Sequence, residues 1–184
     1  MKRKLFALLT AAAMLMTSFA IALPAAADAA EGKVGNGPAV YIDSNSVSST
    51  EDGTQENPYK TLSPIHDKSG IQPGTTFYIK YGSVFNSGIK IKSSGEEGNP
   101  ITLTTYGDPA DGKPVINGGK NSVEAQQAIL IFSEGHITID GLKLTCYNPE
   151  NYNDFQEGKI VRRSGIWVAG SPWEGSQTVV KGLT

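Results

Sequence analysis

Phe77-Tyr-Ile-Lys-Tyr81, Gly88-Ile-Lys-Ile-Lys92 and Ile101-Thr-Leu-Thr-Thr105 open the stretch that decides the fold, which runs from Thr76 to Leu144. Apolar and polar residues alternate in these segments, which is the pattern of a half-buried β-strand. The pattern recurs in three later segments: Pro114-Val-Ile-Asn117, Ala128-Ile-Leu-Ile-Phe132, and His136-Ile-Thr-Ile-Asp140 running into Leu142-Lys-Leu144. No helical periodicity separates them, so the sequence predicts an all-β chain of short strands.

The spacing of the strands predicts a solenoid. One and the same interval separates Ile79 from Leu103, Ile91 from Val115, and Val115 from Ile139. A constant period in the low twenties, built of strands and turns, is typical of a stacked coil. Each turn of such a coil buries its apolar face against its neighbours. The interval predicts about three coils.

The N-terminus has the pattern of a secretory signal peptide. Lys2-Arg-Lys4 precedes an apolar run from Leu5 to Leu23, and Pro24-Ala-Ala-Ala27 provides a small-residue cleavage site. We expect cleavage after Ala27 or Ala29 and a secreted, extracellular protein. The alternative is an uncleaved membrane anchor, because the apolar run is long for a signal. In this interpretation residues 1–27 are the signal peptide, 28–38 a linker and 39–184 the folded domain.

Charge and cysteine content narrow the class of protein. Cleavage after Ala27 leaves 13 Lys and Arg against 18 Asp and Glu, a formal charge of −5. A mildly acidic chain lacks the basic face that nucleic acid requires, so we expect no nucleic-acid partner. With signal cleavage we expect no membrane contact, and we expect a monomer. The single cysteine, Cys146, excludes an intrachain disulfide and is interpreted as a packed apolar residue.

The order of several short motifs resembles a known family. The motifs are Tyr41-Ile-Asp43, Asp52-Gly-Thr54, Asn57-Pro-Tyr-Lys-Thr-Leu62, Pro73-Gly74, Gly98-Asn-Pro-Ile-Thr102 and Tyr106-Gly107. They look like the entry to the right-handed parallel β-helix of the pectate-lyase-like superfamily, with similarity over roughly residues 39–170. That resemblance implies a secreted bacterial protein. It leaves the activity open, because the fold hosts lyases, hydrolases, epimerases and binding proteins.

The sequence predicts a cap at the N-terminal end of the domain and a strand at its C-terminal end. A strand at residues 39–43 and a short helix around Ile65, ending near Gly70, would cap the N-terminal end of the solenoid. We interpret residues 39–120 as structural. The chain ends at Val179-Val-Lys-Gly-Leu-Thr184 within another apparent strand, so we expect an N-terminal portion of a longer β-helix. In such a case most catalytic residues would lie outside this sequence.

A polar excursion from Tyr147 to Lys159 carries most of the reactive side chains. The catalytic candidates are Asp154, Lys159 and Arg163. The candidates for substrate binding are Tyr152, Arg162, Trp167 and Trp173. An exposed indole can stack on a sugar ring, and Arg can pair with a uronic carboxylate. The alternative is an ordered lid whose charges are simply solvated.

Asp43 and Asp52 are the candidate metal ligands. They lie in a loop that also holds Asn45 and Glu51, and clustered oxygen ligands can hold calcium. The alternative is turn chemistry, in which Asp and Asn cap their own backbone. Calcium is the one cofactor that the sequence suggests.

Two classes of function remain open at this stage. The first is a secreted carbohydrate-active protein, polysaccharide lyase-like and acting on acidic, pectin-type polysaccharide. The second is a non-catalytic β-helix that binds glycans or serves as a surface or adhesin module. An inactive fragment of a glycoside hydrolase-type β-helix enzyme is a further alternative.

Overall fold

The computed structural model describes residues 36–118, 127–132, 134–146, 164–169 and 178–184. The predicted signal peptide lies outside the described residues, as do most of the predicted linker and six candidate site residues. These six are Tyr152, Asp154, Lys159, Arg162, Arg163 and Trp173. No helix within the described ranges has the length and apolar character to cross a bilayer.

The described residues are almost entirely strand and turn, as the alternation predicts. The strands are β1 (Ala39–Ile42), β2 (Thr76–Lys80), β3 (Val84–Phe85), β4 (Ile89–Ile91), β5 (Ile101–Tyr106), β6 (Val115–Gly118), β7 (Gln127–Phe132), β8 (Ile137–Asp140), β9 (Lys143–Cys146), β10 (Ser164–Ala169) and β11 (Thr178–Lys181). A single turn of 3-10 helix, η1 (Pro109–Asp111), follows β5. Sequence alternation missed only β3 among these strands, because so short a strand cannot show a period.

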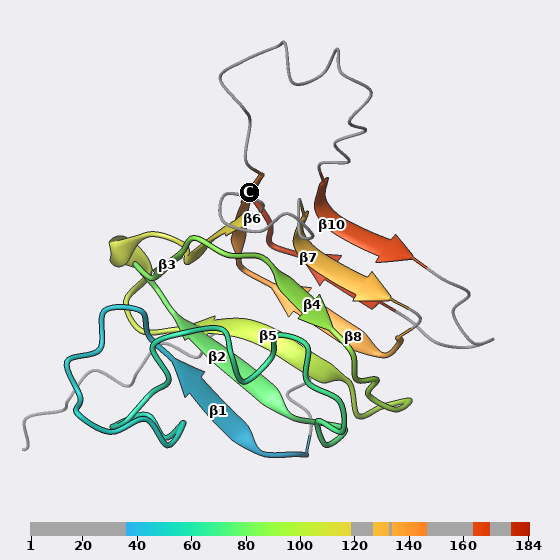
Figure 1. Ribbon diagram of the computed structural model, residues 1–184, viewed down its shortest axis with the longest axis horizontal. Coiled ribbons are helices and arrows are strands. Elements are labelled where there is room, and N and C mark those ends of the chain that lie inside the picture. The colour runs from blue at the N-terminus through green and yellow to red at the C-terminus, as the bar shows by residue number, and fades with distance from the viewer. Residues whose placement is uncertain (1–35, 119–126, 133, 147–163, 170–177) are drawn as a thin grey trace, which may run out of the picture.

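The strands form three sheets, and every strand pair in them is parallel. The sheet orders are β1-β2-β5-β8-β11, β3-β6-β9 and β10-β7-β4. From β2 onward, successive strands along the chain belong to successive sheets, so each complete coil contributes one strand to each sheet. Figure 1 shows the coils stacked from blue β1 at one end to red β10 at the other. This is the arrangement of a β-helix-like solenoid, and it agrees with the expected small number of coils.

The predicted constant period is wrong. Ile79 pairs with Thr105, and Ile91 pairs with Ile131 rather than Val115. Val115 pairs with Lys143 rather than Ile139. The chain between paired positions is much longer from β8 to β11 than from β2 to β5. The turns between strands differ in length from coil to coil, so the pairing has no fixed sequence interval.

The core is a set of apolar side chains that stack along the axis of the solenoid. Phe77 is in register with Leu103, and Leu103 with Ile139, and all three are buried. Ile89 and Ile129 form a second stack. Parallel pairing in register places like positions one above the other, so each coil covers the apolar side chains of the next.

The N-terminal segment caps the first coil along all three sheets. In the first sheet, β1 pairs with β2 from Ala39 to Ile42. At the second, the amide of Val84 donates to Ser44 Oγ over 2.9 Å. At the third, the amide of Asp67 donates to the carbonyl of Lys90 over 2.8 Å. Edge groups of the first coil that would otherwise be unpaired are thereby bonded, which confirms the predicted capping strand.

The predicted short helix around Ile65 is wrong. The chain makes one hydrogen-bonded turn, in which the amide of His66 donates to the carbonyl of Leu62 over 2.9 Å. Asp67 then takes a positive φ of 56° and turns its amide toward β4. The cap therefore ends in a turn, because bonding the edge of β4 takes the backbone out of the helical conformation.

Truncation of a stacked core residue should destabilise the whole solenoid. Ile129 is fully buried in register with Ile89, so Ile129→Ala should lower the free energy of unfolding by about 2–5 kcal/mol. Urea denaturation measures this loss. Val47→Ala, at a residue that is 99% exposed, is the control and should change the free energy of unfolding by less than about 0.5 kcal/mol. Equal effects of the two substitutions would contradict the stacked core.

Candidate functional site

A cleft of about 1330 Å³ lies at the capped end of the solenoid, over the outer face of the first sheet. One rim is the polar loop after β1, and the other is the turn that leads into η1. We call it the tyrosine cleft. It is lined by Tyr41, Asp43, Asn45, Ser46, Val47, Ser48, Gln55, Glu56, Pro58, Tyr78, Lys80, Tyr81, Tyr106, Gly107, Asp108 and Pro109.

The floor of the tyrosine cleft comes from three neighbouring strands. Phe77 and Ile79 point into the core, so Tyr78 and Lys80 of β2 point outward. Tyr41 of β1 is in register with Tyr78, and Tyr106 of β5 is in register with Lys80. The parallel pairing thus brings three tyrosines from distant parts of the sequence onto one face.

The ring of Tyr41 contacts the rings of both Tyr78 and Tyr106. Tyr41 and Tyr78 stack with centroids 5.0 Å apart and an interplanar angle of 17°. Tyr106 meets Tyr41 edge-on, at 5.0 Å and 84°. Such offset-stacked and edge-to-face pairs are favourable arrangements for aromatic rings. The contacts hold the rings together as an ordered aromatic cluster.

A partly buried ion pair holds Asp43 at the end of this floor. Lys80 Nζ lies 3.0 Å from Asp43 Oδ2, and the amide of Asn45 donates to Asp43 Oδ1 over 2.8 Å. The Asp43 side chain is only 6% exposed. Both carboxylate oxygens are therefore engaged, so Asp43 has a positioning role and is not available as a free nucleophile or base.

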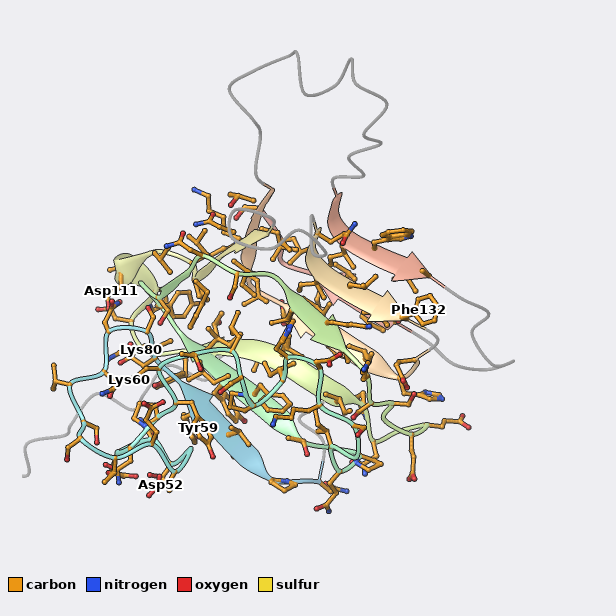
Figure 2. The ribbon with its side chains drawn as sticks, in the orientation of Figure 1. Asp52, Tyr59, Lys60, Lys80, Asp111 and Phe132 are labelled. Carbon is orange, nitrogen blue, oxygen red and sulfur yellow. The ribbon has the colours of Figure 1, made fainter. Side chains whose placement is uncertain are left out.

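Internal hydrogen bonds order the loop that forms one rim. Asp52 Oδ1 accepts from the amide of Thr54 over 2.9 Å and from the Thr54 hydroxyl over 2.7 Å. These bonds lower the pKa of Asp52. Lys60 Nζ donates to the carbonyl of Ser48 over 2.6 Å. Figure 2 labels Lys60 and Asp52 at this loop. The rim is thus built by turn chemistry, which was one of the two interpretations of the acidic loop.

The environment of Tyr78 and Tyr106 keeps their hydroxyls protonated. Burial, with smaller contributions from Asp43 and Tyr41, raises the pKa of Tyr106 to about 12. Burial and Tyr41 also raise the pKa of Tyr78. At neutral pH both phenols are neutral and can donate hydrogen bonds. Neither can act as a phenolate nucleophile there.

The predicted site residues that the structure describes are not brought together. Asp43 lines the tyrosine cleft, whereas Asp52 does not. Trp167 of β10 is in register with Leu130 of β7, in another sheet. Ile166 packs against the core, whereas Val168 is 47% exposed. The described part of the chain contains no group of three His, Cys, Asp or Glu side chains that could hold a metal ion, and calcium stays a prediction.

Tyr41, Tyr78 and Tyr106 are absent from the candidates predicted from the sequence, because residues 39–120 have the pattern of structural strands and turns. A signal was present. Tyr41 and Tyr78 occupy outward positions beside buried apolar neighbours, so alternation marks both as surface aromatics. Tyr106 follows a buried threonine, Thr105, so apolar alternation does not mark it. The three rings come together only through the pairing of β1, β2 and β5. The constant period predicted the wrong register for that pairing.

Comparison with known proteins adds a carbohydrate context. The chain is 31% identical over 181 residues to a lacto-N-biosidase from Bifidobacterium longum subsp. longum. It is 29% identical over 140 residues to the uncharacterized protein YwoF of Bacillus subtilis. Crystal structures of the GH136 lacto-N-biosidase from Eubacterium ramulus share the fold, with TM-scores of 0.65 and 0.63 at 19% and 22% identity. No protein-family model matches the chain.

The chain spans only a small part of these relatives. The matches cover 82% of this chain but 11% of the Bifidobacterium protein, and 74% of this chain but 27% of YwoF. The structural matches cover 79% of this chain and 26% of the Eubacterium protein. The relatives with a stated activity are glycoside hydrolases. They support the hydrolase-type alternative and give no support to the pectin-lyase prediction.

The raised pKa of Tyr106 predicts a loss of stability at alkaline pH. The folded chain favours the protonated phenol, so the contribution of Tyr106 is complete below pH 10 and declines as the pH rises toward 12. Denaturation of Tyr106→Phe across this range should show a smaller decline in the free energy of unfolding than the parent chain. In a titration followed by tyrosinate absorbance, the Tyr106→Phe variant should lack one phenol that ionises at high pH in the parent chain. Identical pH dependence of the two proteins would contradict the assignment of the raised pKa to Tyr106.

Proposed function

We propose that this chain is part of a secreted, carbohydrate-active protein of the glycoside hydrolase type, built on a right-handed parallel β-helix. The observation that carries the proposal is the tyrosine cleft, on a fold shared with GH136 lacto-N-biosidases. Right-handed coiling follows from the strong preference of parallel crossover connections for that hand. Secretion follows from the N-terminal pattern of residues 1–27.

The chemistry of the tyrosine cleft suits a sugar. Tyrosine rings offer an apolar face for the C–H face of a pyranose and a polar edge for its hydroxyls. Ser46, Ser48 and Gln55 add neutral donors and acceptors along the loop rim. A polysaccharide or oligosaccharide is therefore the proposed partner.

We assign sugar binding rather than bond cleavage to the tyrosine cleft. Hydrolysis of a glycosidic bond generally needs two carboxyl groups, one of them able to deliver a proton. Of the three carboxylates that line the cleft, Asp43 is held by Lys80 and the amide of Asn45, whereas Glu56 and Asp108 are exposed to solvent. None of them is a buried, unpaired carboxyl of the kind that delivers a proton, and Tyr78 and Tyr106 stay neutral at neutral pH. This observation favours a second candidate function, a glycan-binding module without catalysis. Asp154, Lys159 and Arg163 stay predictions for catalytic roles, as does calcium binding by Asp43 and Asp52.

The name of the Bifidobacterium relative suggests the first ligand to test, a glycan that ends in lacto-N-biose. We expect the full chain to bind such a glycan and to form no unsaturated product from polygalacturonate. Tyr78→Ala should weaken binding about tenfold, or about 1.4 kcal/mol, because it removes a stacking surface. Isothermal titration calorimetry measures the affinity, and ultraviolet absorbance detects any lyase product.

Phe132→Ala provides the matched control. Phe132 is 54% exposed and lies in another sheet at the far side of the molecule from Lys80 (Figure 2). Its truncation should leave the affinity unchanged. Release of disaccharide from the bound glycan would assign hydrolysis to this chain, whereas binding without release would favour the glycan-binding module. Unsaturated product from polygalacturonate, or no binding to any glycan tested, would overturn the proposal.

A further inference from the structure

We infer that the tyrosine cleft selects uncharged carbohydrate and rejects uronic acid polymers, because its charged residues leave an uncompensated negative rim. The inference rests on the proposed function, since it takes carbohydrate as the ligand. It goes further by naming the chemical class of that carbohydrate and the residues that set it.

The charges that line the tyrosine cleft do not balance. Among the described lining residues, Asp43, Glu56 and Asp108 are acidic and Lys80 is the only cation. Lys80 is occupied by Asp43 in the ion pair at 3.0 Å. Glu56 and Asp108 form no ion pair with a cation within the described ranges. The cleft therefore offers an anionic ligand two unneutralised carboxylates and no free ammonium or guanidinium group.

The two free carboxylates come from different segments that line the cleft. Glu56 belongs to the loop between β1 and β2, whereas Asp108 precedes η1 after β5. Both residues are exposed at the cleft mouth. The amide of Ala110 donates to Asp108 Oδ1 over 2.9 Å, which fixes this carboxylate at the start of η1. A ligand in the cleft therefore shares it with two exposed carboxylates.

The same carboxylates favour a neutral sugar. Carboxylate oxygens accept hydrogen bonds from sugar hydroxyls, and charge-assisted bonds of this kind are strong. The phenol groups of Tyr78 and Tyr106 stay protonated and add donors to the floor. A uronate ring keeps the stacking face but brings a carboxylate against like charges, which disfavours binding. Recognition of pectin-type polymers would need free cations, and the described residues that line the cleft supply none.

The test compares two ligands that differ only in charge at C6. Cellotetraose and its C6-oxidised tetraglucuronate share ring size and linkage, and chitotetraose serves as a second neutral probe. We expect the full chain to bind at least one neutral tetramer about tenfold or more tightly than the uronate. Raising the salt concentration from low to molar levels should reduce this ratio, because salt screens exposed charges. Titration calorimetry measures each dissociation constant.

Charge-neutralising variants locate the effect. Glu56→Gln combined with Asp108→Asn should reduce the ratio of uronate to neutral dissociation constants by about tenfold, through tighter uronate binding. Glu96→Gln combined with Glu97→Gln is the matched control. This control makes the same change in net charge, but in the exposed turn before β5, at the end of the strand opposite Tyr106. It should leave the ratio of the two dissociation constants unchanged.

The outcomes separate this inference from the proposed function. Binding of neutral tetramers with the expected ratios supports both. Binding of the uronate as tightly as the neutral probes, or a ratio that the control variant shifts equally, would overturn the selectivity and leave carbohydrate binding intact. No binding of any tetramer, together with no binding of the lacto-N-biose glycan, would overturn both.

Discussion

Parallel pairing of each strand with the strand above it in the next coil is the constraint on which the rest of the structure depends. It aligns like positions, so buried Phe77, Leu103 and Ile139 fall in one stack. The same register determines the outer surface, because every inward residue has outward neighbours that also align. The same strand pairing therefore builds both the core and the floor of the cleft. A change of register by one residue would turn the inward side chains outward and the outward side chains inward.

The first coil needs a different solution, since no coil precedes it. The N-terminal segment bonds the edges of β2, β3 and β4 through β1, Ser44 and Asp67. That cap also builds the cleft, because β1 brings Tyr41 next to Tyr78 and the loop after β1 rises as a rim. The same residues thus cap the solenoid and form the proposed binding surface. Binding sites commonly lie on loops that a rigid scaffold holds in place.

The electrostatics of the cleft separate its aromatic floor from its acidic rim. Lys80 forms an ion pair with Asp43, so its ammonium group is not free to pair with a ligand. Burial keeps the phenols of Tyr78 and Tyr106 protonated. The result is a surface of neutral donors and apolar rings flanked by acceptors. Such a surface matches the hydroxyls and C–H faces of an uncharged sugar better than it matches the carboxylates of a uronic acid polymer.

The sequence by itself determined that the chain is all-β, where all the described strands except β3 lie, and which residues of most strands point inward. It did so because alternation is a local property, written in neighbouring residues. Only the tertiary structure decided which strands pair and which tyrosines meet. The coils differ in length because their turns carry no period, and closing a longer turn costs little extra entropy. The cleft joins Tyr41, Tyr78 and Tyr106 through contacts between distant segments, which local alternation does not encode.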